Sequence, residues 1–160
     1  MSRSEAVVLI YGEGGHQKEM ELFIDTLPKN DTIFYILLGP HKIKKNNSTY
    51  FYLNDIRHKN NRLKSVYMSA KHILLTLHTL LKISLKYKSL GIISTGPGIA
   101  ILPFAIFKLL KVKTIYIESF CRFKTSSIAG RAMYKISNRF LVQNEELLAI
   151  YPKAEYSGRL

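Results

Sequence analysis

Short apolar runs alternate with stretches of helical periodicity along the whole chain. The first run covers residues 6–11, and it is followed by apolar positions at helical spacing from Met20 to Leu27, ending before Pro28. Further strand-like runs are predicted at residues 32–38, 50–53, 91–94, 114–118, 139–142 and 155–156. Alternating strands and helices favour an α/β fold built on a doubly wound parallel sheet.

The later helices are predicted at residues 66–86, 99–110, 126–136 and 144–151. The helix at 66–86 has the clearest period, and we expect its apolar stripe to face the core: Ala70, Ile73, Leu74, Leu77, Leu80 and Leu81. A second face, turned by roughly 120°, mixes basic residues with leucine: Lys71, Leu75, His78, Lys82 and Lys86. This face is either solvated or rests on anionic lipid.

Composition limits the classes of protein that fit. With 160 residues, 47% of them hydrophobic, the chain can form one domain with a real core. A single cysteine, Cys121, excludes an internal disulfide framework, and the sequence predicts neither a metal site nor a cofactor. The most apolar stretch, residues 99–110, falls short of the ~20 residues that span a bilayer, and no signal peptide precedes the first strand.

Charge is the unusual part of the composition. The chain has 24 Lys and Arg against 11 Asp and Glu, a formal net charge of +13. Such a surface attracts polyanions, which include nucleic acid, anionic lipid headgroups and phosphorylated substrates.

Two glycine-rich turns follow predicted strands and precede predicted helices. The first is Gly12-Glu13-Gly14-Gly15-His16 and the second is Thr95-Gly96-Pro97-Gly98. Glycine lets backbone N–H groups approach a ligand closely, and a helix N-terminus adds unpaired N–H groups, so both turns suit an anion. Neither turn matches the P-loop or the dinucleotide fingerprint, and a tight turn with a surface histidine explains the first one equally well.

Two titratable residues are expected beside these turns. His16 ends the first turn, and Glu118 ends the predicted strand at 114–118. Because the carboxyl ends of parallel strands share one edge of a sheet, the turns and the loop after Glu118 should converge there. Either residue could act as a general base, although Glu118 could instead cap a helix or pair with Arg122.

Five segments, in this order, resemble the PssD/CpsF polysaccharide-biosynthesis proteins: residues 12–16 (GEGGH), 94–98 (STGPG), 114–119 (TIYIES), 140–143 (FLVQ) and 151–154 (YPKA). These proteins are similar to the membrane-associated subunit of the eukaryotic transferase that adds the second N-acetylglucosamine to dolichol-linked sugar. They are also similar to the N-terminal half of MurG, a GT-B glycosyltransferase. The resemblance implies one Rossmann-like domain over residues 1–160, the N-terminal half of a GT-B enzyme, with the donor-binding half on another chain.

The resemblance also implies roles by position. His16 and Glu118 correspond to the candidate catalytic residues. The acceptor diphosphate is expected to bind at Gly12, Gly14, Gly15, Gly96, Gly98 and Ser119. The chain departs from the family at Glu13, whose charge would oppose a nearby diphosphate, and at Asn144, which replaces an aromatic residue. It also lacks the N-terminal transmembrane helix of the eukaryotic subunit, so membrane attachment is expected to be peripheral.

The expected function is that of the acceptor- and membrane-binding subunit of a heterodimeric glycosyltransferase. The enzyme would transfer a sugar from a UDP-sugar, bound by the partner chain, to a polyprenyl-diphosphate-linked acceptor in capsule or exopolysaccharide assembly. The site would lie at the cytoplasmic face of the inner (plasma) membrane, and the chain alone would be inactive or weakly active. One alternative is a non-catalytic scaffold that recruits the donor-binding subunit to the membrane.

A third function, nucleic-acid binding, is suggested by the net charge alone. The basic stretch at residues 41–64 contains a single aromatic cluster, residues 50–52, and no recognised nucleic-acid module is present. We therefore predict no nucleic-acid partner.

Overall fold

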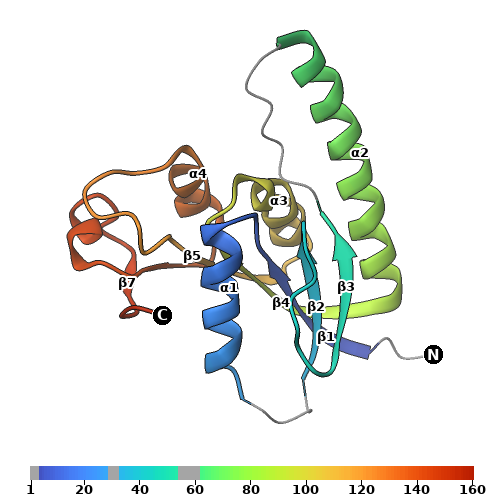
Figure 1. Cartoon of the computed structure of the whole chain (residues 1–160), viewed down its shortest axis with the longest axis horizontal. Helices are drawn as coiled ribbons and strands as arrows, with labels where there is room; N and C mark the ends of the chain where they lie inside the picture. Colours follow the sequence, from blue (N-terminus) through green and yellow to red (C-terminus); the bar gives the residue numbers. More distant parts are fainter. Residues whose placement is uncertain (1–3, 29–32, 54–61) are drawn as a thin grey trace.

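A parallel sheet forms the centre of the computed structural model, which describes residues 4–28, 33–53 and 62–160 (Figure 1). Within these residues the sheet has seven strands in the order β3-β2-β1-β4-β5-β6-β7. The strands are β1 (Ser4–Ile10), β2 (Phe34–Gly39), β3 (Ser48–Tyr52), β4 (Tyr87–Thr95), β5 (Lys113–Ile117), β6 (Arg139–Val142) and β7 (Glu155–Tyr156). The order reverses between β1 and β4, which confirms the doubly wound, Rossmann-like sheet.

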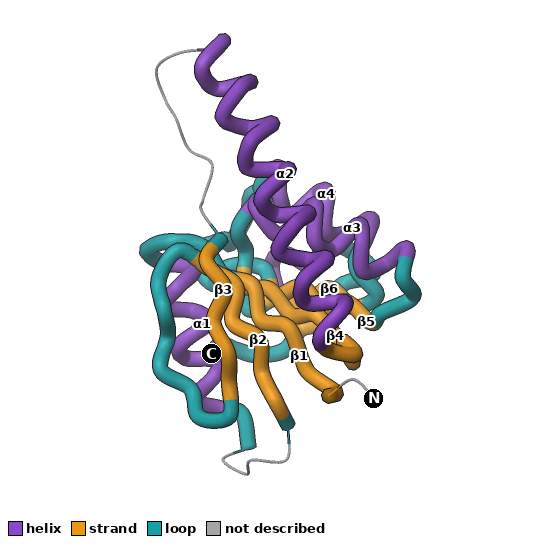
Figure 2. The backbone as a smooth tube through the Cα atoms, turned by 90° about the vertical axis from the view of Figure 1, so that its right-hand side faces the viewer, coloured by secondary structure: helices purple, strands orange, loops and turns teal. Residues whose placement is uncertain are grey.

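Helices cover both faces of this sheet. They are α1 (Gly15–Thr26), α2 (Arg62–Lys86), α3 (Ile101–Leu109) and α4 (Ile128–Ile136), with short 3-10 helices at Gly98–Ala100 and Glu145–Ala149. Figure 2 shows α1 on one face and α2, α3 and α4 on the other. The helix predicted at 99–110 thus begins with a 3-10 turn and continues as α3, and the helix predicted at 144–151 is a 3-10 helix.

The core has two parts because successive side chains of a strand point to opposite faces. On β1, Val8 and Ile10 belong to the cluster beneath α2, α3 and α4. Leu9 belongs to the second cluster, with Met20 and Ile24 of α1. Burial on both faces explains why the strands appear in the sequence as continuous apolar runs.

The orientation of α2 differs from the prediction. In the predicted core stripe, Leu80 is buried, but Ile73, Leu74 and Leu81 are 44%, 67% and 62% exposed. Ile83 is fully buried instead. The helical period groups residues into faces, but it does not say which face meets the sheet, and α2 carries leucine on more than one face.

An exposed surface of leucine and basic residues runs along the second half of α2. Apart from Lys71, whose side chain lies outside the described part, the predicted membrane residues Leu75, His78, Lys82 and Lys86 are exposed. Leu74, Leu81 and Leu85 extend this set. We call these seven exposed residues the basic leucine surface. Among the described residues, none of the helices combines the length and hydropathy needed to cross a bilayer.

The basic stretch at residues 41–64 is described only in part. Residues 54–61 of this stretch lie outside the described residues. The predicted strand at 50–53 is present as β3 and pairs in parallel with β2. Ile43 and Leu53 on either side of β3 are buried, which anchors the described part of this stretch to the sheet.

Candidate functional site

A cleft of about 1320 Å³ lies at the carboxyl ends of β1, β4 and β5. Its lining comes from the two glycine turns, the loop after β5 and the start of α4, and includes Glu13, Gly14, Gly15, His16, Gly96, Pro97, Gly98, Glu118, Ser119, Cys121, Arg122 and Ser127. The structure therefore brings together the three loops predicted to converge. Gly12 is buried outside this lining, whereas the other predicted catalytic and acceptor-binding residues all line the cleft.

The two glycine turns pack directly against each other. Gly14 and Gly96 have φ angles of 63° and 87°, in the region that favours glycine. A Cβ atom at Gly96 would lie 2.4 Å from Cε1 of His16, so no larger residue fits there without moving the ring. The Thr95 hydroxyl donates to the His16 carbonyl oxygen at 3.0 Å. These contacts fix the position of His16 at the floor of the cleft.

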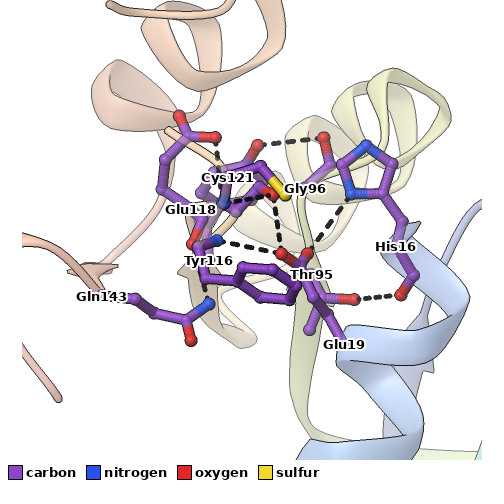
Figure 3. Close-up of polar contacts among 10 residues, drawn as sticks. His16, Glu19, Thr95, Gly96, Tyr116, Glu118, Cys121 and Gln143 are labelled. Carbon is purple, nitrogen blue, oxygen red and sulfur yellow. Dashed lines mark hydrogen bonds and ion pairs between the residues drawn. The ribbon is translucent and has the colours of Figure 1, made fainter. Parts of the chain in front are cut away.

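Glu118 is a buried carboxyl at the end of β5, 2% exposed. Its Oε1 accepts the backbone N–H of Ser119 at 3.1 Å, and its Oε2 accepts the Tyr151 hydroxyl at 3.4 Å. Gln143 donates to the Glu118 carbonyl oxygen at 3.1 Å (Figure 3). Burial raises the pKa of Glu118, while the Ser119 N–H and the charge of Arg122 oppose the shift. A raised pKa suits a carboxyl that exchanges protons with a substrate.

This raised pKa gives a test of stability. The native state holds the Glu118 proton at pH values where the unfolded chain has lost it, so stability falls as pH rises from the ordinary pKa of 4.5 through the raised one. Glu118→Gln removes this titration and keeps an oxygen for Ser119. The free energy of unfolding of the variant minus that of wild type should therefore be larger at about pH 8 than at about pH 4.

Thermal unfolding at both pH values measures this difference. Glu13→Gln changes an exposed carboxyl of the same cleft and controls for the removal of one negative charge. Its stability difference from wild type should vary less between the two pH values. A difference between Glu118→Gln and wild type that stays constant with pH would contradict the expectation.

Sequence reasoning missed Glu19, a second buried carboxyl. Glu19 lies on α1 three residues after His16 and is 1% exposed. Its Oε1 accepts the Ser119 hydroxyl at 2.6 Å and the Phe120 N–H at 2.9 Å. Its Oε2 lies 3.5 Å from Nδ1 of His16. The i,i+3 spacing from His16 is the one signal in the sequence that could have pointed to it.

The loop after β5 is held from the other side by the segment after β6. Asn144 donates through Nδ2 to the carbonyl oxygens of Phe120 at 2.8 Å and Arg122 at 2.5 Å. Asn144 therefore helps to fix the shape of the cleft wall. Within the described ranges, His, Cys, Asp and Glu side chains form no group of three that could hold a metal ion.

Gly130 is required by the packing of α4 against Glu118. Ser127 caps α4 by accepting the Gly130 N–H at 2.7 Å. A Cβ at Gly130 would lie 1.9 Å from Oε2 of Glu118 and 2.7 Å from the Tyr151 hydroxyl. We expect Gly130→Ala to lower the free energy of unfolding by about 1–3 kcal/mol.

Denaturant unfolding measures this loss. Gly98→Ala is the matched control, because a Cβ there would have no heavy atom within 4 Å. Equal stability of the two variants would show that the contact with Glu118 is relieved at no cost.

The Rossmann-like fold of the chain is similar to one half of GT-B glycosyltransferases. It superposes on Acinetobacter baumannii MurG with a TM-score of 0.63, at 10% identity, covering 98% of this chain and 44% of that one. The UGT2 of Phytolacca americana complexed with UDP-2-fluoroglucose and pterostilbene gives a TM-score of 0.58 at 9% identity, covering 94% and 50%. The chain thus spans about half the length of these structures, and at such identities the likeness concerns the fold.

Sequence similarity identifies the family. Residues 7–160 match the family model for oligosaccharide biosynthesis proteins like Alg14, and the chain belongs to this family. The UDP-N-acetylglucosamine transferase subunit ALG14 of Homo sapiens is 26% identical, covering 98% of this chain and 83% of the human protein. The Debaryomyces hansenii protein of the same name is 26% identical, covering 99% and 77%. The similarity to the eukaryotic subunit and to the MurG fold is confirmed, whereas the PssD/CpsF resemblance stays a prediction.

Proposed function

We propose that this chain is the acceptor- and membrane-binding subunit of a two-chain GT-B glycosyltransferase. The observation that carries the proposal is the convergence of both glycine turns, His16 and Glu118 on one cleft, in a chain of the Alg14 family. Its relatives in human and Debaryomyces hansenii are named as subunits of a UDP-N-acetylglucosamine transferase, and the chain aligns with 83% and 77% of their lengths.

A partner chain binds the UDP-sugar in this proposal. The chain corresponds to 44% of MurG, and the proposal assigns the role of the remaining part of such an enzyme to the partner. The sugar is N-acetylglucosamine by analogy with the named relatives. The acceptor is a sugar linked to polyprenyl diphosphate, and the pathway is capsule or exopolysaccharide assembly.

The cleft supplies the groups that this transfer needs. Backbone N–H groups of the glycine turns and the Arg122 side chain bind the acceptor diphosphate, offsetting the charge of Glu13. The acceptor hydroxyl oxygen then bonds to the anomeric carbon while the bond from that carbon to UDP breaks. The hydroxyl proton passes to His16 or Glu118, both of which line the cleft.

The basic leucine surface of α2 is the proposed contact with the membrane. It exposes lysine and leucine side by side, the combination that binds anionic headgroups and the acyl boundary together. Attachment is peripheral, at the cytoplasmic face of the membrane that holds the lipid-linked acceptor.

Reconstitution of sugar transfer tests the proposal. The partner to use is a protein of the same genome that resembles the C-terminal half of a GT-B enzyme; the reading frames beside this one are searched first. Radiolabelled UDP-N-acetylglucosamine is mixed with a polyprenyl-diphosphate-linked sugar and with each chain alone or both. We expect labelled lipid from the mixture of both chains, and negligible product from either one.

UDP-glucose serves as the control donor. Full turnover by this chain alone would overturn the two-chain assignment. No transfer by the mixture with any UDP-sugar would overturn the enzymatic role.

A further inference from the structure

Glu19 is a buried carboxyl that the proposed reaction leaves without a role. Both hydrogen bonds to its side chain, from Ser119 and from Phe120, go to Oε1. Its Oε2 is also buried and has no hydrogen-bond partner among the described residues, although a buried carboxylate oxygen without one is costly. The group nearest to satisfying it is Nδ1 of His16, at 3.5 Å.

His16 is arranged as the counterpart of this oxygen. Its Nδ1 is likewise buried without a hydrogen-bond partner, while 28% of the side chain is exposed and the residue lines the cleft. Figure 3 shows the ring between Gly96 and Glu19, with Nδ1 on the side of the carboxylate. The contact with Gly96 and the bond from Thr95 limit the movement of the residue. The ring therefore lies within a small movement of a hydrogen bond to Oε2.

We infer that Glu19 is a positioning residue that fixes which nitrogen of His16 carries the proton. A carboxylate can only accept, so it holds the neutral ring with its proton on Nδ1 and leaves the lone pair of Nε2 for the cleft. The distance of 3.5 Å closes to a hydrogen bond when the acceptor binds, as catalytic contacts commonly tighten in the complex. The catalytic consequence rests on the proposed function, whereas the protonation of the ring does not.

The inference assigns His16, rather than Glu118, to proton removal. As the acceptor oxygen bonds to the anomeric carbon and UDP departs, the hydroxyl proton moves to Nε2. The ring is then a cation, and Glu19 stabilises it from the Nδ1 side. Glu118 keeps its two contacts with Ser119 and Tyr151 throughout.

Glu19→Gln separates positioning from a structural role. Its amide oxygen can accept from Ser119 and Phe120 as Oε1 does, which preserves the link between α1 and the loop after β5. Its NH2 group then faces Nδ1 of His16 and donates to it. The neutral ring must carry its proton on Nε2 instead, and it can no longer accept one from the cleft.

Histidine ¹⁵N NMR of the full chain tests the tautomer directly, with the pH raised until the spectra show a neutral His16 ring. The His16 signals are assigned from their loss in His16→Gln. We expect the Nδ1-protonated tautomer in wild type and the Nε2-protonated one in Glu19→Gln. An Nε2-protonated ring in wild type would overturn the inference, whatever the function of the protein.

Kinetics with the partner chain test the catalytic part. We expect Glu19→Gln to lower kcat by about 10²- to 10⁴-fold, by analogy with a triad aspartate changed to its amide, and to leave the acceptor KM within about threefold. Glu19→Asp, which retains a carboxylate, should recover part of the loss. Glu21→Gln, a change of the same kind at a half-buried position of α1 outside the cleft lining, should match wild type.

The outcomes separate the two proposals. A switched tautomer with wild-type kcat would refute the role of Glu19 in catalysis. No transfer by the wild-type mixture, with the expected tautomers observed, would refute the proposed function and leave the protonation of His16 established.

Discussion

His16→Ala is expected to lower partner-dependent sugar transfer by about 10²- to 10⁴-fold, the usual range for loss of a general base. The ring lines the cleft between both glycine turns, with Nδ1 facing a buried carboxylate, and the variant removes it without adding bulk. The acceptor KM should change little, because our proposal assigns diphosphate binding to the backbone N–H groups and Arg122, not to the ring. Initial rates across acceptor concentrations separate the two parameters.

His41→Ala is the matched control, because its side chain is exposed and lies outside the cleft lining. Glu118→Gln in the same assay shows whether the Glu118 carboxyl takes part in transfer. Transfer that survives both His16→Ala and Glu118→Gln would identify the chain as a scaffold that recruits its partner, the alternative that the sequence leaves open.

Removing two lysines of the basic leucine surface should weaken membrane binding by about 30-fold. Each basic residue near an anionic surface contributes about 1 kcal/mol, so the double change Lys82→Ala and Lys86→Ala costs about 2 kcal/mol. Both side chains are exposed in the last two turns of α2. This helix lies on the face of the sheet opposite α1 (Figure 2). Co-sedimentation with vesicles containing anionic lipid measures the loss, which should shrink as salt is added.

The control removes the same charge elsewhere, at Lys18 on α1 and Lys153 after the second 3-10 helix, both exposed. Leu81→Ser and Leu85→Ser should weaken binding further without changing charge. Equal binding by the lysine variant and the control would show that net charge, and not this surface, draws the chain to lipid. Tight RNA binding in a gel shift, with no vesicle binding, would favour a nucleic-acid partner instead.

Much of the fold could be predicted from the sequence because its signals are local. Each strand buried on both faces forms an unbroken apolar run, and the glycine turns interrupt the pattern where β1 and β4 end. Ser127 marks the start of α4, because serine is a preferred N-cap residue. The convergence of the three loops then follows from parallel topology alone, since all of them leave the same edge of the sheet.

The remaining features depend on contacts between distant segments. Glu19 appears in the sequence as an ordinary polar position of an amphipathic helix, and its burial comes from Ser119 and Phe120, a hundred residues later. Nothing in the sequence near Gly130 indicates that a side chain would not fit there; the reason is the packing of α4 against Glu118. The buried face of α2 was predicted incorrectly for a related reason: several of its faces are apolar, and only the sheet decides which is covered.

The direction of α2 has a consequence for how a substrate reaches the protein. As the crossover between parallel strands, this helix runs back along the sheet from the end of β3 to the start of β4. If its basic leucine surface rests on the bilayer, the strands run nearly level with the membrane, and the cleft at their ends opens sideways. A lipid-borne sugar would then arrive by lateral diffusion within one leaflet, without leaving its headgroup layer.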